Sequence, residues 1–114
     1  MMQLSGRPLS LREIARVTLG EENVEIAPGA HTAIQASRRV VEGIVARQAI
    51  IYGVSTGFGK LADVQIPSDQ LGQLQVNLVR SHSCGVGRPL SEVEVRAMML
   101  LRANVLTLGF SGIR

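Results

Sequence analysis

The chain has 114 residues, of which 46% are hydrophobic and 18% are charged, and its formal net charge is +3. This composition excludes an intrinsically disordered chain and fits one small, mainly helical domain, because aliphatic residues must build the core when only 3% of residues are aromatic. The basic residues form no long run, which argues against a nucleic-acid-binding surface.

The first predicted helix begins after Ser10. Ser10 and Glu13 match a capping box, in which the serine hydroxyl and the glutamate carboxylate satisfy free backbone N–H groups of the first helical turn. Apolar residues follow at helical spacing, and Gly20 is a suitable stop. Residues 24–26 alternate weakly in polarity and are expected to form a short strand.

The second predicted helix begins at Pro28 and ends near Gln48, because apolar side chains recur at helical spacing between them. Residues 49–52 are expected to form a second short extended segment, which leads into a glycine-rich loop. The third predicted helix begins at residues 67–69. Its apolar stripe consists of Leu71, Leu74 and Leu78.

The fourth predicted helix follows a second capping box, formed by Ser91 and Glu94, and extends to about Leu108. It is apolar on almost every side, a pattern typical of a helix that is buried all round. Four helices from so short a chain cannot surround it. We therefore expect the chain to be a segment of a larger, helical and oligomeric protein.

The chain is expected to be cytoplasmic. The N-terminal residues lack the apolar core of a secretory signal, and no apolar run reaches the ~18 residues of a membrane span. A single cysteine, Cys84, rules out an internal disulfide and fits a reducing compartment. No metal site is expected, because His82 and Cys84 have no further histidine or cysteine nearby to complete a coordination shell.

The glycine-rich loop begins at Tyr52, the only tyrosine of the chain, and contains Gly53, Gly57 and Gly59. A tyrosine can transfer a proton, and glycines allow a backbone to approach a ligand and a loop to open and close. The alternative is a tyrosine packed at the end of an extended segment before an ordinary turn. Local patterns alone favour that alternative.

A second candidate group lies at the end of the third predicted helix, in the sequence Ser81-His82-Ser83-Cys84. His82 is suited to hydrogen-bond a polar ligand, or alternatively to complement the dipole at the helix C-terminus. Cys84 is interpreted as a small buried thiol rather than a nucleophile.

Three segments, taken together, resemble the aromatic amino acid ammonia-lyases. They are residues 52–59, 74–87 and 95–114, and they match the family in order and spacing. The resemblance covers essentially the whole chain but only the N-terminal part of the family's longer polypeptide. It implies that residues 1–114 are a single N-terminal segment of the ammonia-lyase fold, mainly α-helical, with short β elements at residues 24–26 and 49–52.

The resemblance also implies an activity. The Ser81-His82 pair is similar to that of the histidine-specific branch, which converts L-histidine to trans-urocanate and ammonia as a homotetramer without an external cofactor. The family's electrophile is a methylidene-imidazolone (MIO) ring formed from an internal Ala-Ser-Gly. Because no Ala-Ser-Gly occurs in these 114 residues, the chain alone is expected to be inactive.

The resemblance assigns roles to individual residues. Tyr52 matches the family's proposed base, and residues 52–61 match a mobile lid; Ser55 stands where the family commonly has asparagine. The remaining site residues are Ser81, His82 and Gly59 for substrate binding, and Gly53, Gly57 and Phe58 in the lid. Two alternatives stay open: a lyase or aminomutase acting on tyrosine or phenylalanine, and a non-enzymatic helical module that binds a partner through residues 93–108.

Overall fold

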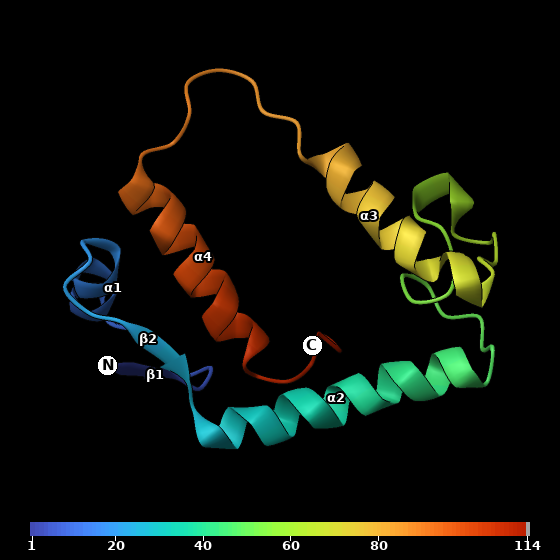
Figure 1. Ribbon diagram of the computed structural model, residues 1–114, viewed down its shortest axis with the longest axis horizontal. Helices are drawn as coiled ribbons and strands as arrows, with labels where there is room; N and C mark the ends of the chain where they lie inside the picture. The colour runs from blue at the N-terminus through green and yellow to red at the C-terminus, as the bar shows by residue number, and fades with distance from the viewer. Residues whose placement is uncertain (114) are drawn as a thin grey trace. The chain divides into compact units, whose positions relative to one another are not determined.

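A computed structural model describes residues 1–113, and the predicted mainly helical fold is confirmed (Figure 1). The chain divides into two compact units. Unit 1 contains Met1–Arg39 and Pro89–Arg114, and unit 2 contains Val40–Arg88. Helix α2 (Pro28–Ala46) begins in unit 1 and ends in unit 2.

Both predicted capping boxes are present, at the starts of α1 (Leu11–Thr18) and α4 (Glu92–Leu106). The Ser10 hydroxyl accepts a hydrogen bond from the Glu13 N–H at 3.3 Å, and the Glu13 carboxylate accepts one from the Ser10 N–H at 2.8 Å. In α4, the Ser91 hydroxyl and backbone N–H both donate to Glu94, which lowers the pKa of that carboxyl. Local chemistry therefore fixes where these two helices begin.

A two-stranded parallel sheet accompanies α1 in unit 1. Its strands are β1 (Met2–Leu4) and β2 (Val24–Ile26), with Met2 opposite Val24 and Leu4 opposite Ile26. β2 matches the predicted strand at residues 24–26. β1 was not predicted, because three residues are too few to show a pattern and their partner lies beyond α1 in the sequence.

The core of unit 1 lies between β1, α1 and α4. Met2, Leu4 and Leu100 are buried together, and half-buried Ile14 and Val17 of α1 pack against them. Burial of these apolar side chains is the main stabilising contribution to unit 1. α1 thus turns its apolar face towards α4, as its periodicity predicts.

Asn104 of α4 ties the N-terminal segment to the helix. Its side-chain amide donates to the Arg7 carbonyl at 2.8 Å and accepts from the Gly6 N–H at 3.1 Å. Other parts of α4 remain uncovered: Met98 and Met99 are 61% and 67% exposed. The expectation that this chain cannot surround its fourth helix is confirmed.

The predicted extended segment at residues 49–52 is wrong, since none of these residues lies in a strand. α2 ends at Ala46, and Gln48 adopts a left-handed backbone with φ of 53°. The Gln48 N–H donates to the Val45 carbonyl and the Ala49 N–H to the Ile44 carbonyl, which is the Schellman arrangement of a helix C-terminus. The chain therefore turns sharply before Tyr52.

The third predicted helix is α3 (Leu71–His82), which follows a 3₁₀ turn at Ser68–Gln70. Its predicted apolar stripe is the half-buried side of the helix, while its other residues are exposed. A further 3₁₀ turn, Gly59–Leu61, lies within the glycine-rich loop.

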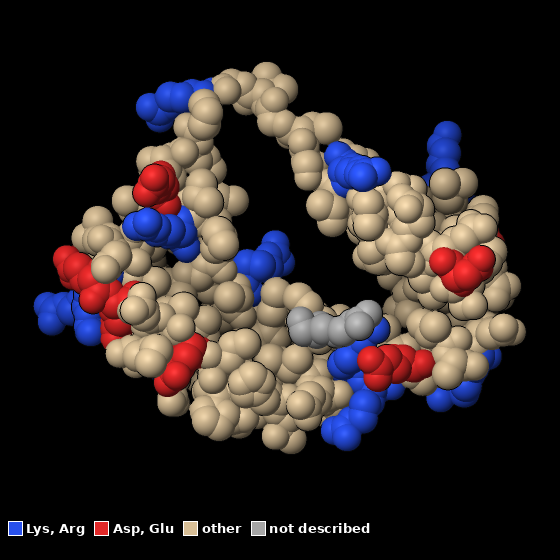
Figure 2. All heavy atoms as spheres, viewed as in Figure 1, with Lys and Arg blue, Asp and Glu red and all other residues tan. Residues whose placement is uncertain are grey.

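Charged residues of both signs are interspersed on the face that Figure 2 shows, without a large area of one sign. None of the helices in the described part of the chain combines the length and the hydrophobicity needed to cross a membrane.

Acidification should test the first capping box. The Arg7 guanidinium and the Ser10 hydroxyl and N–H hold the pKa of Glu13 down, from a usual value of 4.5 to about 2. Because folding favours the ionised carboxylate, its stabilising contribution is complete above about pH 4.5 and is lost as the pH falls towards 2. We expect Glu13→Gln to reduce the free energy of unfolding at neutral pH and to flatten its decline across this window.

Urea unfolding monitored by circular dichroism at a series of pH values measures this effect. Glu21→Gln is the matched control, because the Glu21 carboxylate takes part in no ion pair within residues 1–113. Parallel pH profiles for Glu13→Gln and the unmodified chain would contradict the assignment.

Candidate active site

The glycine-rich loop of unit 2 is closed on itself by backbone hydrogen bonds. The Gly57 N–H donates to the Val64 carbonyl at 3.0 Å, and the Ile66 N–H donates to the Ser55 carbonyl at 2.9 Å. Between them, Thr56 forms an isolated antiparallel bridge with Gln65. Residues 55–57 therefore lie beside residues 64–66 and close an ordered loop between them, as in a compact surface loop.

Tyr52 stands on the outside of this loop, and its side chain contacts the Phe58 ring edge to face. The two ring centroids are 6.1 Å apart and the ring planes are inclined by 78°, a favourable aromatic geometry. The residue is 64% exposed, and its hydroxyl has no hydrogen-bond partner among the described residues. The phenol oxygen is thus accessible to a molecule outside the loop.

Two of the predicted lid glycines are required by the backbone. Gly53 has φ of +75°, which L side chains rarely adopt, so the chain reverses directly after Tyr52. At Gly57 a Cβ atom would lie 2.7 Å from the Leu61 carbonyl oxygen, which is too close for any side chain. Gly59 begins the 3₁₀ turn that follows Phe58.

Ser55 is the residue whose role the sequence did not reveal. It is buried, and its hydroxyl both donates to the Ala49 carbonyl and accepts from the Ile51 N–H. Gln48 is the non-glycine residue with positive φ in the described part of the chain, so Ser55 itself has an ordinary backbone. Asparagine adopts a left-handed backbone more readily than serine, but this position does not need one. The presence of serine where the family commonly has asparagine therefore gives no reason to expect a different loop geometry.

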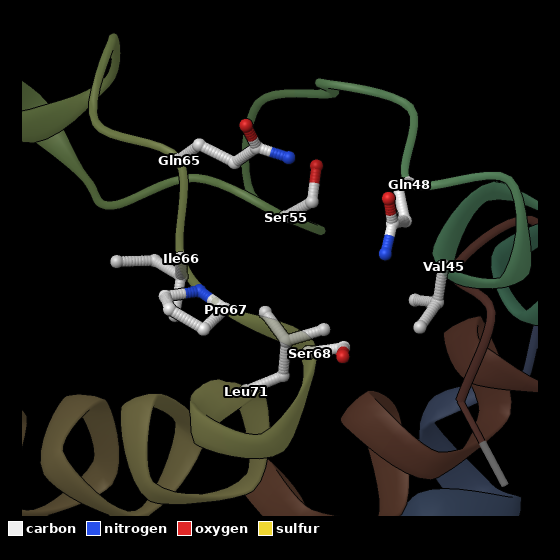
Figure 3. A pocket seen from close by; sticks show the side chains of 8 residues that line it. All are labelled: Val45, Gln48, Ser55, Gln65, Ile66, Pro67, Ser68 and Leu71. Carbon is white, nitrogen blue, oxygen red and sulfur yellow. The ribbon is translucent and has the colours of Figure 1, made fainter.

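A small pocket of about 110 Å³ adjoins Ser55. Gln48, from beyond the end of α2, and Gln65, from the returning side of the loop, point towards this space (Figure 3). Val45 and Leu71 contribute apolar walls. The pocket is large enough for an additional methyl group beside Ser55.

His82 is the last residue of α3, and its ring is held by the helix backbone. Its Nδ1 lies 2.9 Å from the Leu78 carbonyl oxygen, and the Ser81 hydroxyl donates to the same oxygen at 2.9 Å. Because a carbonyl only accepts, Nδ1 is the donor, and Nε2 of the neutral ring is left as an acceptor. His82 is exposed, so that acceptor is available to a ligand.

Cys84 does not match its interpretation as a buried thiol, because it is exposed. It follows the end of α3 at Ser83, where the chain leaves the helix, and its thiol lies 3.5 Å from the Ser81 carbonyl oxygen. Hydrophobicity alone predicted burial, but the surrounding residues 83–91 pack against nothing that would cover it.

All the residues assigned to the site by resemblance belong to unit 2. Within unit 2, however, the side-chain interactions of the described residues do not join Tyr52 to His82: the Tyr52 ring contacts Phe58, and the His82 ring bonds to the Leu78 carbonyl. The described residues therefore supply two separate polar groups rather than a complete binding site.

A larger hollow in unit 1, of about 430 Å³, is lined mainly by apolar side chains, with Glu22 and Arg96 among them. Glu22 already pairs with Arg16 at 2.9 Å, and Arg96 with the Thr18 carbonyl and Glu92. These charges are therefore satisfied internally. No group of three potential metal-ligating side chains is found within residues 1–113.

Comparison with known proteins identifies the family of the chain. The family model for aromatic amino acid lyases matches residues 9–114. The chain belongs to the aromatic amino acid lyase family. This match includes both the Tyr52 loop and the end of α3.

Individual members of the aromatic amino acid lyase family agree with this assignment. The chain is 52% identical over its whole length to histidine ammonia-lyase of Geobacillus thermodenitrificans, and it spans 23% of that protein. A solved structure of tyrosine aminomutase from Streptomyces globisporus superimposes on the chain with a TM-score of 0.91 and a sequence identity of 36%. The match covers 99% of this chain and 22% of the aminomutase chain. The structure of ergothionase from Treponema denticola has a TM-score of 0.93 and a sequence identity of 30% to this chain. That match covers 98% of this chain and 22% of the ergothionase chain.

Proposed function

We propose that residues 1–114 form the N-terminal segment of a histidine ammonia-lyase, a cytoplasmic homotetramer that converts L-histidine to trans-urocanate and ammonia. The observation that carries the proposal is the 52% identity to histidine ammonia-lyase over all 114 residues. The chain spans less than a quarter of that relative, so the activity is proposed for the longer polypeptide.

In this reaction the substrate loses a proton from its β carbon and the amino group from its α carbon. The electron pair of the broken C–H bond becomes the new C=C bond, and the pair of the C–N bond leaves with ammonia. Tyr52 is the proposed base: its side-chain oxygen accepts the β proton. The accessible phenol and its contact with Phe58 support this role.

In the longer polypeptide, the MIO ring of the family would supply the electrophile that makes the amino group a better leaving group. Its precursor, Ala-Ser-Gly, is absent from the 114 residues, which therefore cannot form it. The contribution of this segment is accordingly limited to proton transfer and substrate recognition.

His82 is the proposed reader of the substrate ring, with Ser81 and Gly59 as further contacts. The Leu78 carbonyl fixes the proton on Nδ1, so Nε2 accepts a hydrogen bond from an imidazole N–H. A phenyl ring presents no donor to Nε2. The hydrogen bond would therefore favour histidine over phenylalanine.

A chimera tests the proposal. Residues 1–114 replace the matching 23% of the Geobacillus thermodenitrificans enzyme, and the release of urocanate is followed by ultraviolet absorbance. We expect turnover of L-histidine comparable to that of the parent enzyme and none of L-phenylalanine. The isolated chain is the control and should release no urocanate, because it cannot form the electrophile. A chimera that assembles like the parent but is inactive would contradict the proposal.

The alternative substrate is tyrosine. It is favoured by the structural match to tyrosine aminomutase, with its 36% identity. The same chimera decides between the two, because an aminomutase-like specificity would appear as consumption of L-tyrosine in place of L-histidine.

A further inference from the structure

We propose that Ser55 is a positioning residue for Tyr52, and that its hydroxyl holds the turn from which the tyrosine projects. The inference rests on the proposed role of Tyr52 as base and adds to it the group that fixes the base in place.

The hydroxyl of Ser55 bridges two backbone groups directly before Tyr52. It donates to the Ala49 carbonyl at 2.6 Å and accepts from the Ile51 N–H at 3.0 Å. The Ser55 N–H also donates to the Ile51 carbonyl at 3.0 Å, so both polar groups of Ile51 are bound to one residue. Ser55 is only 5% exposed, and water therefore competes poorly for these bonds.

Tyr52 has few contacts of its own that would fix its position. Its side chain is 64% exposed and its described ring contact is with Phe58, which belongs to the same loop. On its C-terminal side, Gly53 allows wide backbone freedom, and the bond from the Gly53 N–H to the Thr56 hydroxyl is long, at 3.4 Å. The restraint on the N-terminal side, through Ser55, is thus the stronger one.

A second anchor connects Ser55 to the rest of unit 2. Its carbonyl accepts from the Ile66 N–H at 2.9 Å, and Pro67 and the 3₁₀ turn before α3 follow directly. Ser55 therefore joins the chain entering the loop to the chain leaving it. Proton transfer depends on placement to within about 1 Å. Loss of the hydroxyl's bonds to Ala49 and Ile51 should therefore lower the rate of the chemical step more than it weakens substrate binding.

The pocket beside Ser55 allows a test that separates the hydroxyl from side-chain shape. Threonine and valine have nearly the same shape, and the space of about 110 Å³ accommodates their additional methyl group. Ser55→Thr retains the hydroxyl and Ser55→Val removes it. Ser37→Ala is the matched control, since within residues 1–113 the Ser37 hydroxyl bonds inside α2, to the Ile34 carbonyl.

The first measurement is tyrosine fluorescence anisotropy of the 114-residue chain. Tyr52 is its only tyrosine and it has no tryptophan, so the signal reports on Tyr52 alone. We expect lower anisotropy for Ser55→Val and an unchanged value for Ser55→Thr and Ser37→Ala. If Ser55→Val does not fold by circular dichroism, Ser55→Ala, which adds no bulk, takes its place.

The second measurement is kinetics in the chimera. We expect kcat to fall about 100-fold in Ser55→Val with KM nearly unchanged, and Ser55→Thr to restore it. Unchanged anisotropy and kcat in Ser55→Val would overturn the inference. So would decreases in anisotropy and kcat in Ser55→Thr as large as those in Ser55→Val. Reduced anisotropy in Ser55→Val, together with a Tyr52→Phe chimera that remains active, would support the positioning role of Ser55 and refute the base role of Tyr52.

Discussion

Tyr52→Phe should reduce the turnover of L-histidine by the chimera by about 10²–10⁴-fold, the usual contribution of a positioned general base. The substitution keeps the ring and its edge-to-face contact with Phe58, so the loop should retain its structure. It removes only the oxygen that accepts the β proton. Steady-state kinetics on L-histidine measure the loss, and gel filtration confirms that assembly is unchanged.

Phe58→Leu is the control for this experiment. It removes the aromatic contact while leaving the phenol of Tyr52 in place. The turnover of L-histidine should therefore fall much less in Phe58→Leu than in Tyr52→Phe. Deuterium at the substrate β carbon adds a second readout, because slower proton abstraction should increase the kinetic isotope effect in Tyr52→Phe. Near-normal turnover by Tyr52→Phe would eliminate the tyrosine as base.

His82→Leu should change substrate selection. In the chimera, kcat/KM for L-histidine is expected to fall about 10- to 100-fold, because an imidazole N–H left unpaired in a closed site costs about 1–3 kcal/mol. The rate on L-phenylalanine should rise, since leucine offers an apolar surface to its ring. Parallel kinetics on the two substrates give the ratio that measures the switch.

His82→Gln serves as the comparison, because its amide keeps a hydrogen-bond acceptor near the position of Nε2. It should retain more of the preference for histidine than His82→Leu does. An unchanged ratio of histidine to phenylalanine turnover in His82→Leu would reject the role of His82 in recognition.

Features that depend on neighbouring residues were the ones the sequence predicted well. The capping boxes at Ser10 and Ser91 place the starts of α1 and α4 correctly, because a serine and a glutamate three residues apart are sufficient to satisfy the first helical turn. The half-buried stripe of α3 follows in the same way from helical periodicity.

Features that depend on distant residues were missed. β1 is formed by three residues that pair with β2 after the whole of α1. Asn104, a polar residue in an apolar helix, is buried because its amide meets Gly6 and Arg7, which lie almost a hundred positions earlier. No local pattern identifies such partners.

The candidate site was only partly predictable for the same reason. Tyr52 and its glycines are conspicuous in the sequence, and resemblance gives them a role. The extended segment expected before Tyr52 is instead a turn, because Gln48 takes a left-handed backbone and the Ser55 hydroxyl draws Ala49 and Ile51 together. A serine three residues after a tyrosine carries no signal of that kind, although serine side chains commonly bond to nearby backbone.

The division of the chain into units also bears on the order in which its parts can fold during synthesis. Unit 2 is continuous, whereas the core of unit 1 joins Met2 and Leu4 to Leu100. A ribosome therefore completes the segment that carries Tyr52 and His82 before it makes the helix that covers the first strand. Until Leu100 and Asn104 emerge, residues 2–7 lack both the apolar contact with Leu100 and the hydrogen bonds to the Asn104 side chain. The segment that carries the residues proposed for chemistry can thus fold before the core of Met2, Leu4 and Leu100 is complete.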